Sequence, residues 1–151
     1  MIVNIRVDHR LLHGQVAFSW TNYLKADCIL IANDDAAQDE LKRITLKLAK
    51  PQGIKLVIKS IEDSIYSLKS GVTDQYRLFI VVESINDVYR LAMTYPKIKE
   101  IYIGWTIPTD ETRNISKAVN VTKREEFLIK ELLCMGKDIS IQMVPSDRKI
   151  P

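Results

Sequence analysis

The 151-residue chain is predicted to form one α/β domain, with a doubly wound, mostly parallel β-sheet and helices on both of its faces. Apolar segments of strand length alternate with helical patterns almost to the end of the chain, which favours a parallel sheet. Residues 78–82 form an unbroken apolar run, typical of a central strand covered on both faces. The length suits a single domain with a sizeable core, and no repeat or linker divides it.

The first elements follow from hydrophobic periodicity and helix-start signals. A strand is expected over 2–7, followed by a helix that begins near Gly14. A second strand is expected over 28–32, followed by a helix for which the carboxylates of Asp34 and Asp35 suit an N-cap. The inward-facing residues of these two helices are expected to be Val16, Ala17, Trp20 and Leu24 in one, and Leu41, Ile44 and Leu48 in the other.

The middle of the chain continues the alternation. Strand 54–58 is followed by a helix with Ser60 as its N-cap, and strand 78–82 by a helix with Ser84 as its N-cap. In both cases an aspartate stands three residues after the serine, as in a variant of the capping box. These segments place strands and helices in strict succession.

The alternation weakens after strand 100–103. Residues 104–116 show neither helical nor strand periodicity, so a loop is expected there. Thr122 and Glu125 form a capping box for the last helix. The remaining elements are a short strand 118–121, a helix 123–135, a strand 139–144 and a loose tail 145–151.

Composition excludes several functional classes. The net charge is only +3 and no basic block occurs, which argues against a nucleic-acid partner. No apolar run approaches transmembrane length and no signal peptide is recognisable, so a cytosolic protein without membrane insertion is expected. Cys28 and Cys134 are isolated and are expected to be reduced thiols. Phosphate-binding P-loop, dinucleotide and metal-ligand motifs are absent, so no cofactor and no metal are expected.

The stretch from Asp8 to Val16 is the strongest functional signal. It lies between the first strand and the first helix, where α/β proteins bind anions on unpaired backbone N–H groups at a helix N-terminus. Arg10 adds a fixed cation, and His13 adds a nucleophile that can be neutral near pH 7. This combination predicts phosphoryl chemistry, although a structural histidine and a surface arginine paired with Asp8 or Asp34 are the alternatives.

The same stretch, Val-Asp-His-Arg-Leu-Leu-His-Gly-Gln-Val, resembles the phosphorylation loop of the B subunit (IIB) of the mannose/fructose/sorbose family of the phosphoenolpyruvate-dependent sugar phosphotransferase system. Residues 31–37 resemble a second segment of that family, which follows its second strand. The resemblance covers nearly the whole chain and implies one IIB domain of the mannose/sorbose type over 1–151. It also implies a doubly wound, largely parallel sheet with the histidine loop at the carboxyl ends of the strands.

The resemblance implies a phosphocarrier, a component of a protein-Nπ-phosphohistidine–sugar phosphotransferase. His13 would accept a phosphoryl group from the phosphohistidine of the IIA component, on another polypeptide. It would then pass the group to a sugar transported by the membrane IIC and IID components, with which a cytoplasmic IIB associates peripherally. From the residues alone, both ring nitrogens of His13 are candidates.

The candidate site residues have distinct expected roles. The catalytic residues are His13, as the phosphohistidine intermediate, and Arg10, whose planar guanidinium suits phosphate oxygens. Backbone amides of Leu12, Gly14 and Gln15 are expected to bind the phosphate as well. Asp8 either orients His13 or braces Arg10, and a loop-capping aspartate is the structural alternative for it. Because two partners must reach the same imidazole in turn, His13 is expected to be exposed in a shallow site. Ser84 and Thr106 could donate to phosphate, but a helix cap and a loop hydroxyl are the simpler interpretations.

Two residues depart from the family pattern. His9 stands where the family usually has a second aspartate, and Trp105 follows Gly104 where a small or polar residue is usual. Trp105 could cover the site, contact a partner or simply pack on the domain. These departures leave open a non-catalytic IIB-like regulator that binds partners and signals sugar availability. A third interpretation is a small phosphate-binding α/β protein, which a large enclosed pocket would favour.

Overall fold

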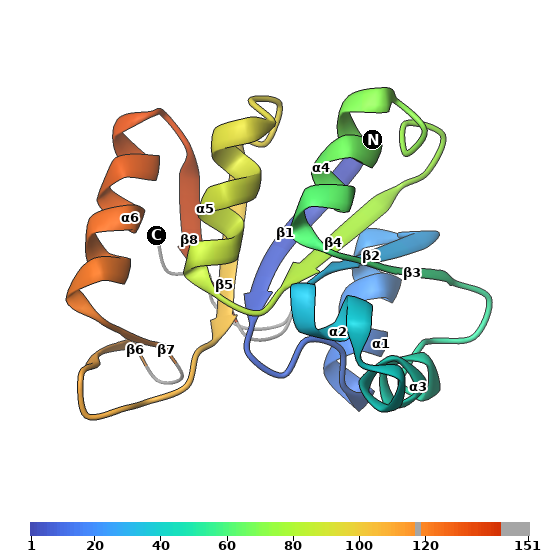
Figure 1. Cartoon of the computed structure of the whole chain (residues 1–151), viewed down its shortest axis with the longest axis horizontal. Coiled ribbons are helices and arrows are strands. Elements are labelled where there is room, and N and C mark those ends of the chain that lie inside the picture. The colour runs from blue at the N-terminus through green and yellow to red at the C-terminus, as the bar shows by residue number, and fades with distance from the viewer. Residues whose placement is uncertain (117–118, 143–151) are drawn as a thin grey trace.

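A central sheet of six parallel strands organises the chain (Figure 1). The computed structural model describes residues 1–116 and 119–142, with residues 14–16 and 116 described by their backbone only. The strand order is β3-β2-β4-β1-β5-β8, and every pairing is parallel. The predicted fold class is therefore confirmed. The strands are β1 (Ile2–Asp8), β2 (Cys28–Ala32), β3 (Lys55–Lys59), β4 (Leu78–Val82), β5 (Glu100–Trp105) and β8 (Asp138–Ile141).

Helices cover both faces of the sheet. One face carries α4 (Ile61–Ser70), α5 (Ile85–Thr94) and α6 (Lys123–Cys134), which lie in front of the strands in Figure 1. The opposite face carries α1 (Gly14–Leu24), α2 (Asp34–Gln38) and α3 (Glu40–Leu48). Alternate residues of β2 and β4 enter two separate apolar clusters, as expected for strands buried on both sides.

The chain changes direction beside β1. After β1 it crosses to α1 on one face, whereas after the neighbouring strand β4 it crosses to α5 on the other face. Two adjacent parallel strands that send their connections to opposite faces leave a crevice at their carboxyl ends, where α/β proteins bind ligands. The loop that carries His13 begins at this point.

The helix predicted after β2 is divided at Asp39, and its predicted inward face is wrong. Asp39 has an extended backbone (φ −98°, ψ 106°) and its side chain accepts a hydrogen bond from the Lys42 N–H at 3.1 Å, which starts a new helix. In α3 only Leu46 is buried, whereas Leu41 and Leu48 are 74% and 83% exposed and Ile44 is also exposed. The restart rotates the helix, so that the predicted apolar stripe faces solvent.

This geometry predicts very different stability effects for two leucines of one helix. Leu46→Ala is expected to lower the free energy of unfolding by about 2–4 kcal/mol, because it leaves a cavity in a cluster that contains Trp20 and Phe79. Leu48→Ala, the matched control, is expected to change it by no more than about 0.5 kcal/mol. Urea unfolding followed by circular dichroism measures both. A larger loss for Leu48→Ala would contradict the observed orientation of α3.

A short hairpin occupies part of the segment predicted to be a loop. β6 (Arg113–Ser116) pairs antiparallel with β7 (Val119–Val121), and the Arg113 guanidinium bonds the Glu126 carboxylate of α6 at 2.8 Å. That hydrogen bond and the positive charge of Arg113 lower the pKa of Glu126. Four residues with one central isoleucine give too little periodicity for a strand prediction. The predicted tail 145–151 lies outside the described residues.

Helix caps explain where most helices begin. The side chains of Ser60, Ser84 and Thr122 each accept a hydrogen bond from a first-turn backbone N–H, and Thr122 and Glu125 form the predicted capping box. For α2 the cap is Asn33 rather than an aspartate, with Asp34 in the first turn. Within the described residues, no helix has the length and apolar character needed to cross a bilayer.

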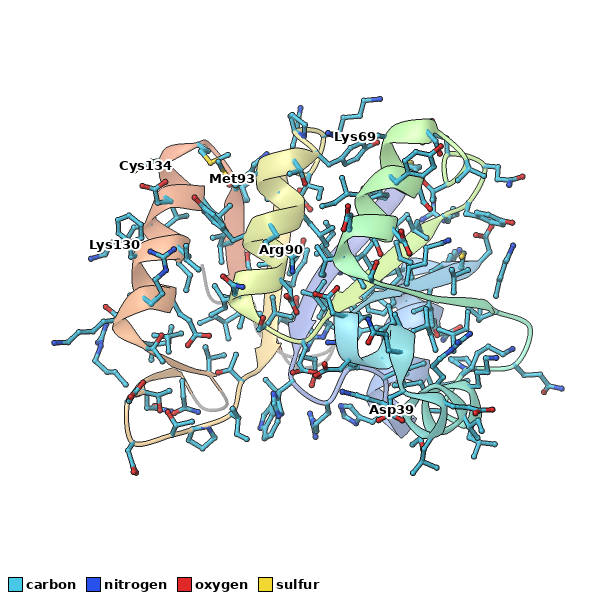
Figure 2. The ribbon with its side chains drawn as sticks, viewed as in Figure 1. Asp39, Lys69, Arg90, Met93, Lys130 and Cys134 are labelled. Atoms are coloured by element: carbon cyan, nitrogen blue, oxygen red, sulfur yellow. The ribbon has the colours of Figure 1, made fainter. Side chains whose placement is uncertain are left out.

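The two cysteines differ in accessibility, which gives a labelling prediction. Figure 2 shows Cys134 at the end of α6, where it is exposed, whereas Cys28 is buried in β2 and burial raises the pKa of its thiol. We expect one thiol per chain to react rapidly with a disulfide reagent in the native protein and two after unfolding. Cys134→Ser should remove the fast phase. A fast phase that persists in this variant would contradict the burial of Cys28.

Candidate functional site

A tight turn links β1 to the candidate histidine. Leu11 N–H donates to the Asp8 carbonyl at 2.9 Å, and Arg10 N–H donates to Asp8 Oδ1 at 2.9 Å. Leu11 takes the left-handed conformation with φ 59°, which a leucine rarely adopts and which costs about 1–2 kcal/mol. Leu11 and Leu12 are both buried and thereby fix the loop onto the domain. The turn places Arg10 and His13 beside the same carboxylate.

Asp8 contacts both predicted catalytic side chains. Its Oδ1 lies 3.4 Å from Arg10 Nε, and its Oδ2 lies 3.5 Å from His13 Nε2. The Asp8 side chain is 2% exposed, against 39% for Arg10 and 29% for His13. The two roles proposed for Asp8 as alternatives, orienting the imidazole and bracing the guanidinium, are therefore both geometrically available to one carboxylate.

The imidazole of His13 is only partly accessible, which differs from the expectation of an exposed side chain. Its Nε2 and the facing Asp8 Oδ2 are buried, and neither has a hydrogen-bond partner in the part of the chain that the structure describes. Another protein cannot approach a nitrogen that is buried against a carboxylate. Nε2 is therefore the ring nitrogen that faces Asp8 rather than solvent.

The N-terminus of α1 differs from that of the other helices. His13 is its N-cap residue, with an extended backbone, but the side chain makes no capping hydrogen bond and the first turn holds no acidic residue. The helices α2 to α6 each have a capping side chain and at least one acidic residue in the first turn. The partial positive charge of α1 is thus left uncompensated, which suits an anion beside His13.

Aromatic contacts define the outer side of the loop. The Arg10 guanidinium carbon lies 4.8 Å from the centroid of the Trp105 ring, and the ring of His9 lies 5.6 Å from that indole at an interplanar angle of 50°. The backbone N–H of His9 also donates a hydrogen bond to the backbone carbonyl of Trp105 at 2.9 Å. The two residues that depart from the family pattern are therefore in contact with each other.

Sequence reasoning missed a buried arginine beneath the site. Arg6 is 2% exposed, and its guanidinium carbon lies 4.5 Å from the centroid of the Trp20 ring. A Cβ on Gly104 would lie 2.8 Å from the Arg6 guanidinium carbon, so any larger residue there would force the arginine to shift from this position. The available signal was the alternation of polar Asn4, Arg6 and Asp8 with apolar residues in a central strand.

A cleft of about 240 Å³ adjoins the loop, lined by residues that follow β1, β4, β5 and β7. His9, Glu83 and Thr106 are among its lining residues. The simpler interpretations hold for two of the predicted donors, since Ser84 caps α5 and the Thr106 hydroxyl exchanges hydrogen bonds with the backbone of Asn120. The segments that follow β1, β4 and β5 therefore line one cleft at the carboxyl edge of the sheet.

Acidic side chains border the cleft and are compensated by cations. Glu83 accepts from Asn33 at 3.1 Å and from Lys42 at 3.4 Å, and Asp34 pairs with Arg90 at 3.3 Å. Burial raises the pKa of Asp87, with a hydrogen bond from Ser84 and the charge of Arg90 acting in the opposite direction. Asp34 therefore pairs with Arg90, and Arg10 remains with Asp8.

The predicted site residues fall into three groups. Asp8, Arg10 and His13 are brought together, and Gly14 is the first residue of α1 beside them. Leu12 is buried, so its side chain packs into the domain rather than facing solvent. The side chain of Gln15 lies outside the described part of the structure. No group of three or more His, Cys, Asp or Glu residues is placed to hold a metal ion within that part.

A parallel sheet with a histidine, an arginine and an uncapped helix N-terminus at its carboxyl edge suits a protein that carries a phosphoryl group. Comparison with known proteins identifies the class. Residues 2–151 match the family described as the PTS system sorbose subfamily IIB component, where PTS denotes the phosphotransferase system. The chain belongs to this family and is a phosphotransferase component of the IIB type.

Individual relatives agree with this assignment. A probable phosphotransferase enzyme IIB component of Streptococcus pyogenes serotype M6 is 38% identical, over 99% of this chain and 96% of that protein. The sorbose-specific EIIB component of Klebsiella pneumoniae is 28% identical, over 96% of this chain and 88% of that protein. The crystal structure of the IIB domain of the K. pneumoniae sorbose permease superposes with a TM-score of 0.94 at 27% identity, covering 99% of this chain and 92% of that chain.

Proposed function

We propose that this chain is a phosphocarrier in which His13 takes the phosphoryl group from a phosphohistidine of a IIA component. It then passes the group to a sugar held by membrane IIC and IID components. The observation that carries the proposal is the contact of Asp8 with both His13 and Arg10 beside the uncapped N-terminus of α1. The family assignment supports it, because a IIB component is a phosphotransferase component.

The acceptance step uses the nitrogen that is not buried. Asp8 beside Nε2 favours the tautomer with its proton on Nε2, which leaves the Nδ1 lone pair free. Nδ1 attacks phosphorus while the donor P–N bond breaks and its electron pair returns to the donor imidazole. As the ring of His13 gains positive charge, its attraction to the Asp8 carboxylate increases.

The phosphoryl oxygens need positive partners during transfer. Asp8 binds Arg10 through Nε, so the two terminal nitrogens of the guanidinium remain for phosphate. Backbone N–H groups of the first turn of α1, which begins at Gly14, supply further donors. In the second transfer, a sugar hydroxyl oxygen attacks phosphorus, the P–Nδ1 bond breaks with its electrons returning to Nδ1, and the hydroxyl proton leaves to a base on the acceptor side.

The experiment is phosphorylation of the intact protein with phosphoenolpyruvate, the general phosphotransferase proteins and a IIA component. We expect a mass gain of one phosphate located on His13, and a phosphorus NMR shift typical of Nδ1. Addition of sugar and membranes that contain IIC and IID should discharge it. No phosphate on His13 would refute the proposal. Phosphorylation without discharge in the presence of competent membranes would favour the regulatory function.

A large enclosed pocket at the loop would favour the phosphate-binding alternative. Beneath the loop, between β1 and α1, the described residues leave a cavity of about 10 Å³. This is room for at most one water molecule, by the usual size criterion of about 10–15 Å³. The phosphate site that we propose therefore lies on the outer side of the loop, where a second protein can reach it.

A further inference from the structure

Arg10 is held at three points, two of which involve Asp8. Its backbone N–H and its Nε both contact Asp8 Oδ1, at 2.9 and 3.4 Å, and its guanidinium carbon lies 4.8 Å from the Trp105 ring centroid. The Arg10 side chain is 39% exposed, so without such contacts it would sample many rotamers. The contact at Nε alone would still allow the guanidinium to swing about that bond.

Trp105 is a fixed support for the guanidinium. It is the last residue of β5, it pairs with Asp8 of β1 just beyond a shift in the strand register, and its carbonyl accepts a hydrogen bond from the backbone N–H of His9 at 2.9 Å. The ring of His9 also contacts the indole. The indole is therefore held at the end of the sheet. A guanidinium that stacks on it is held in a fixed position as well.

We propose that Trp105 is a positioning residue that orients the Arg10 guanidinium toward the phosphoryl group on His13. Stacking occupies one face of the guanidinium and the Asp8 contact occupies Nε. The edge that bears the two terminal nitrogens remains for phosphate oxygens. Trp105 acts through Arg10 and not on the phosphate itself. The inference rests on the proposed function of Arg10 and His13, and it assigns a role to a residue that departs from the family pattern.

The test uses two phosphoryl donors of different size. Phosphoramidate is a small donor that phosphorylates histidine without a docking partner, whereas phosphorylated IIA must dock. We expect Trp105→Leu, which keeps apolar bulk without the aromatic face, to slow phosphorylation of His13 by about 3- to 30-fold with both donors, from the usual strength of a cation–π contact. Trp105→Phe should restore most of the rate. With phosphorylated IIA, the loss should appear in the maximal single-turnover rate and not in the donor concentration at half-maximal rate.

Coupling to Arg10 gives the decisive control. In an Arg10→Ala background, Trp105→Leu should have no further effect, because the residue through which it acts is absent. An equal slowing in both backgrounds would overturn the proposal, as would an unchanged rate with phosphoramidate. A loss confined to phosphorylated IIA would make Trp105 a docking residue, which also overturns it. The NMR signal of the Arg10 Nε–H reports the stacking directly, since Trp105→Leu should remove its ring-current shift.

Failure of the wider functional proposal would be distinguishable from failure of this inference. If the wild-type protein accepted phosphate on His13 from phosphoramidate but never from phosphorylated IIA, the phosphocarrier role would be refuted. The effect of Trp105 variants on the rate with phosphoramidate could still be measured. Wild-type protein in which phosphoramidate leaves His13 unmodified would overturn the inference. Circular dichroism and thermal unfolding of each variant verify that the fold is intact, with Trp105→Phe available where Trp105→Leu fails to fold.

Discussion

Replacing His13 with alanine is expected to abolish phosphoryl acceptance from phosphorylated IIA while leaving the protein folded. In the proposed transfer the imidazole provides the attacking nitrogen, so its loss removes the bond-forming atom rather than an accessory contact. The side chain is partly exposed and makes no capping hydrogen bond, so the fold loses little when it is removed. Intact-mass spectrometry after incubation with the phosphorylation mixture measures the result, and thermal unfolding verifies the fold.

The chain supplies its own matched control for this prediction. It contains only two histidines, and His9 lies in the same loop with its ring against Trp105. His9→Ala should still gain one phosphate. A phosphate that persists in His13→Ala and disappears in His9→Ala would reverse the assignment of the acceptor. Loss of phosphorylation in both variants, with both folded, would show that the loop acts as a unit and that the mass change alone does not identify the nucleophile.

Arg10→Ala is expected to slow phosphoryl transfer by roughly 10²–10³-fold, comparable to removal of one donor from an oxyanion hole. The guanidinium is the cation that Asp8 and Trp105 hold beside His13. Asp8 would also be left without its arginine, close to the phosphoryl oxygens, which adds repulsion. Rapid-quench measurement of single-turnover transfer from phosphorylated IIA gives the rate.

Two further variants show whether the rate depends on the guanidinium of Arg10 or only on positive charge. Arg10→Lys keeps the charge but loses the planar pair of donors, so an intermediate rate is expected. Arg124→Ala removes an arginine that lies over Phe127 on α6 and should leave the rate unchanged. An undiminished rate in Arg10→Ala would show that the N-terminus of α1 alone stabilises the transferred group. A similar loss in Arg124→Ala would point to general electrostatic attraction between the partners.

Local signals allowed much of the fold to be predicted. The run 78–82 became the central strand β4, and the serine, threonine and glutamate caps of α4, α5 and α6 formed as expected. Each of these features depends on residues within a few positions of one another. The restart of the helix at Asp39 was also locally encoded, because Asp39 can cap Lys42, but the long amphipathic pattern of the segment obscured it.

The site was predictable in composition but not in geometry. The sequence places Asp8, Arg10 and His13 in one loop, and the spacing indicates phosphate chemistry. The left-handed Leu11 and the burial of Nε2 of His13 against Asp8 arise from the packing of the loop on the domain, and the stacking of Arg10 on Trp105 depends on residues that meet only after β1 and β5 pair. Arg10 and Trp105 are far apart in the sequence, and hydrophobic periodicity does not predict a contact of this kind.

The alternation along β1 has a consequence for assembly of the sheet. Asn4, Arg6 and Asp8 point to one side of the strand, and Ile5 and Val7 point to the other, into the cluster that holds Ile80 and Val82. Sliding β1 by a single residue between its two neighbours would exchange the sides and drive a guanidinium and a carboxylate into that hydrocarbon interior. The charged residues of β1 thus also favour the observed register of this strand, since a shifted register would bury their charges among apolar side chains.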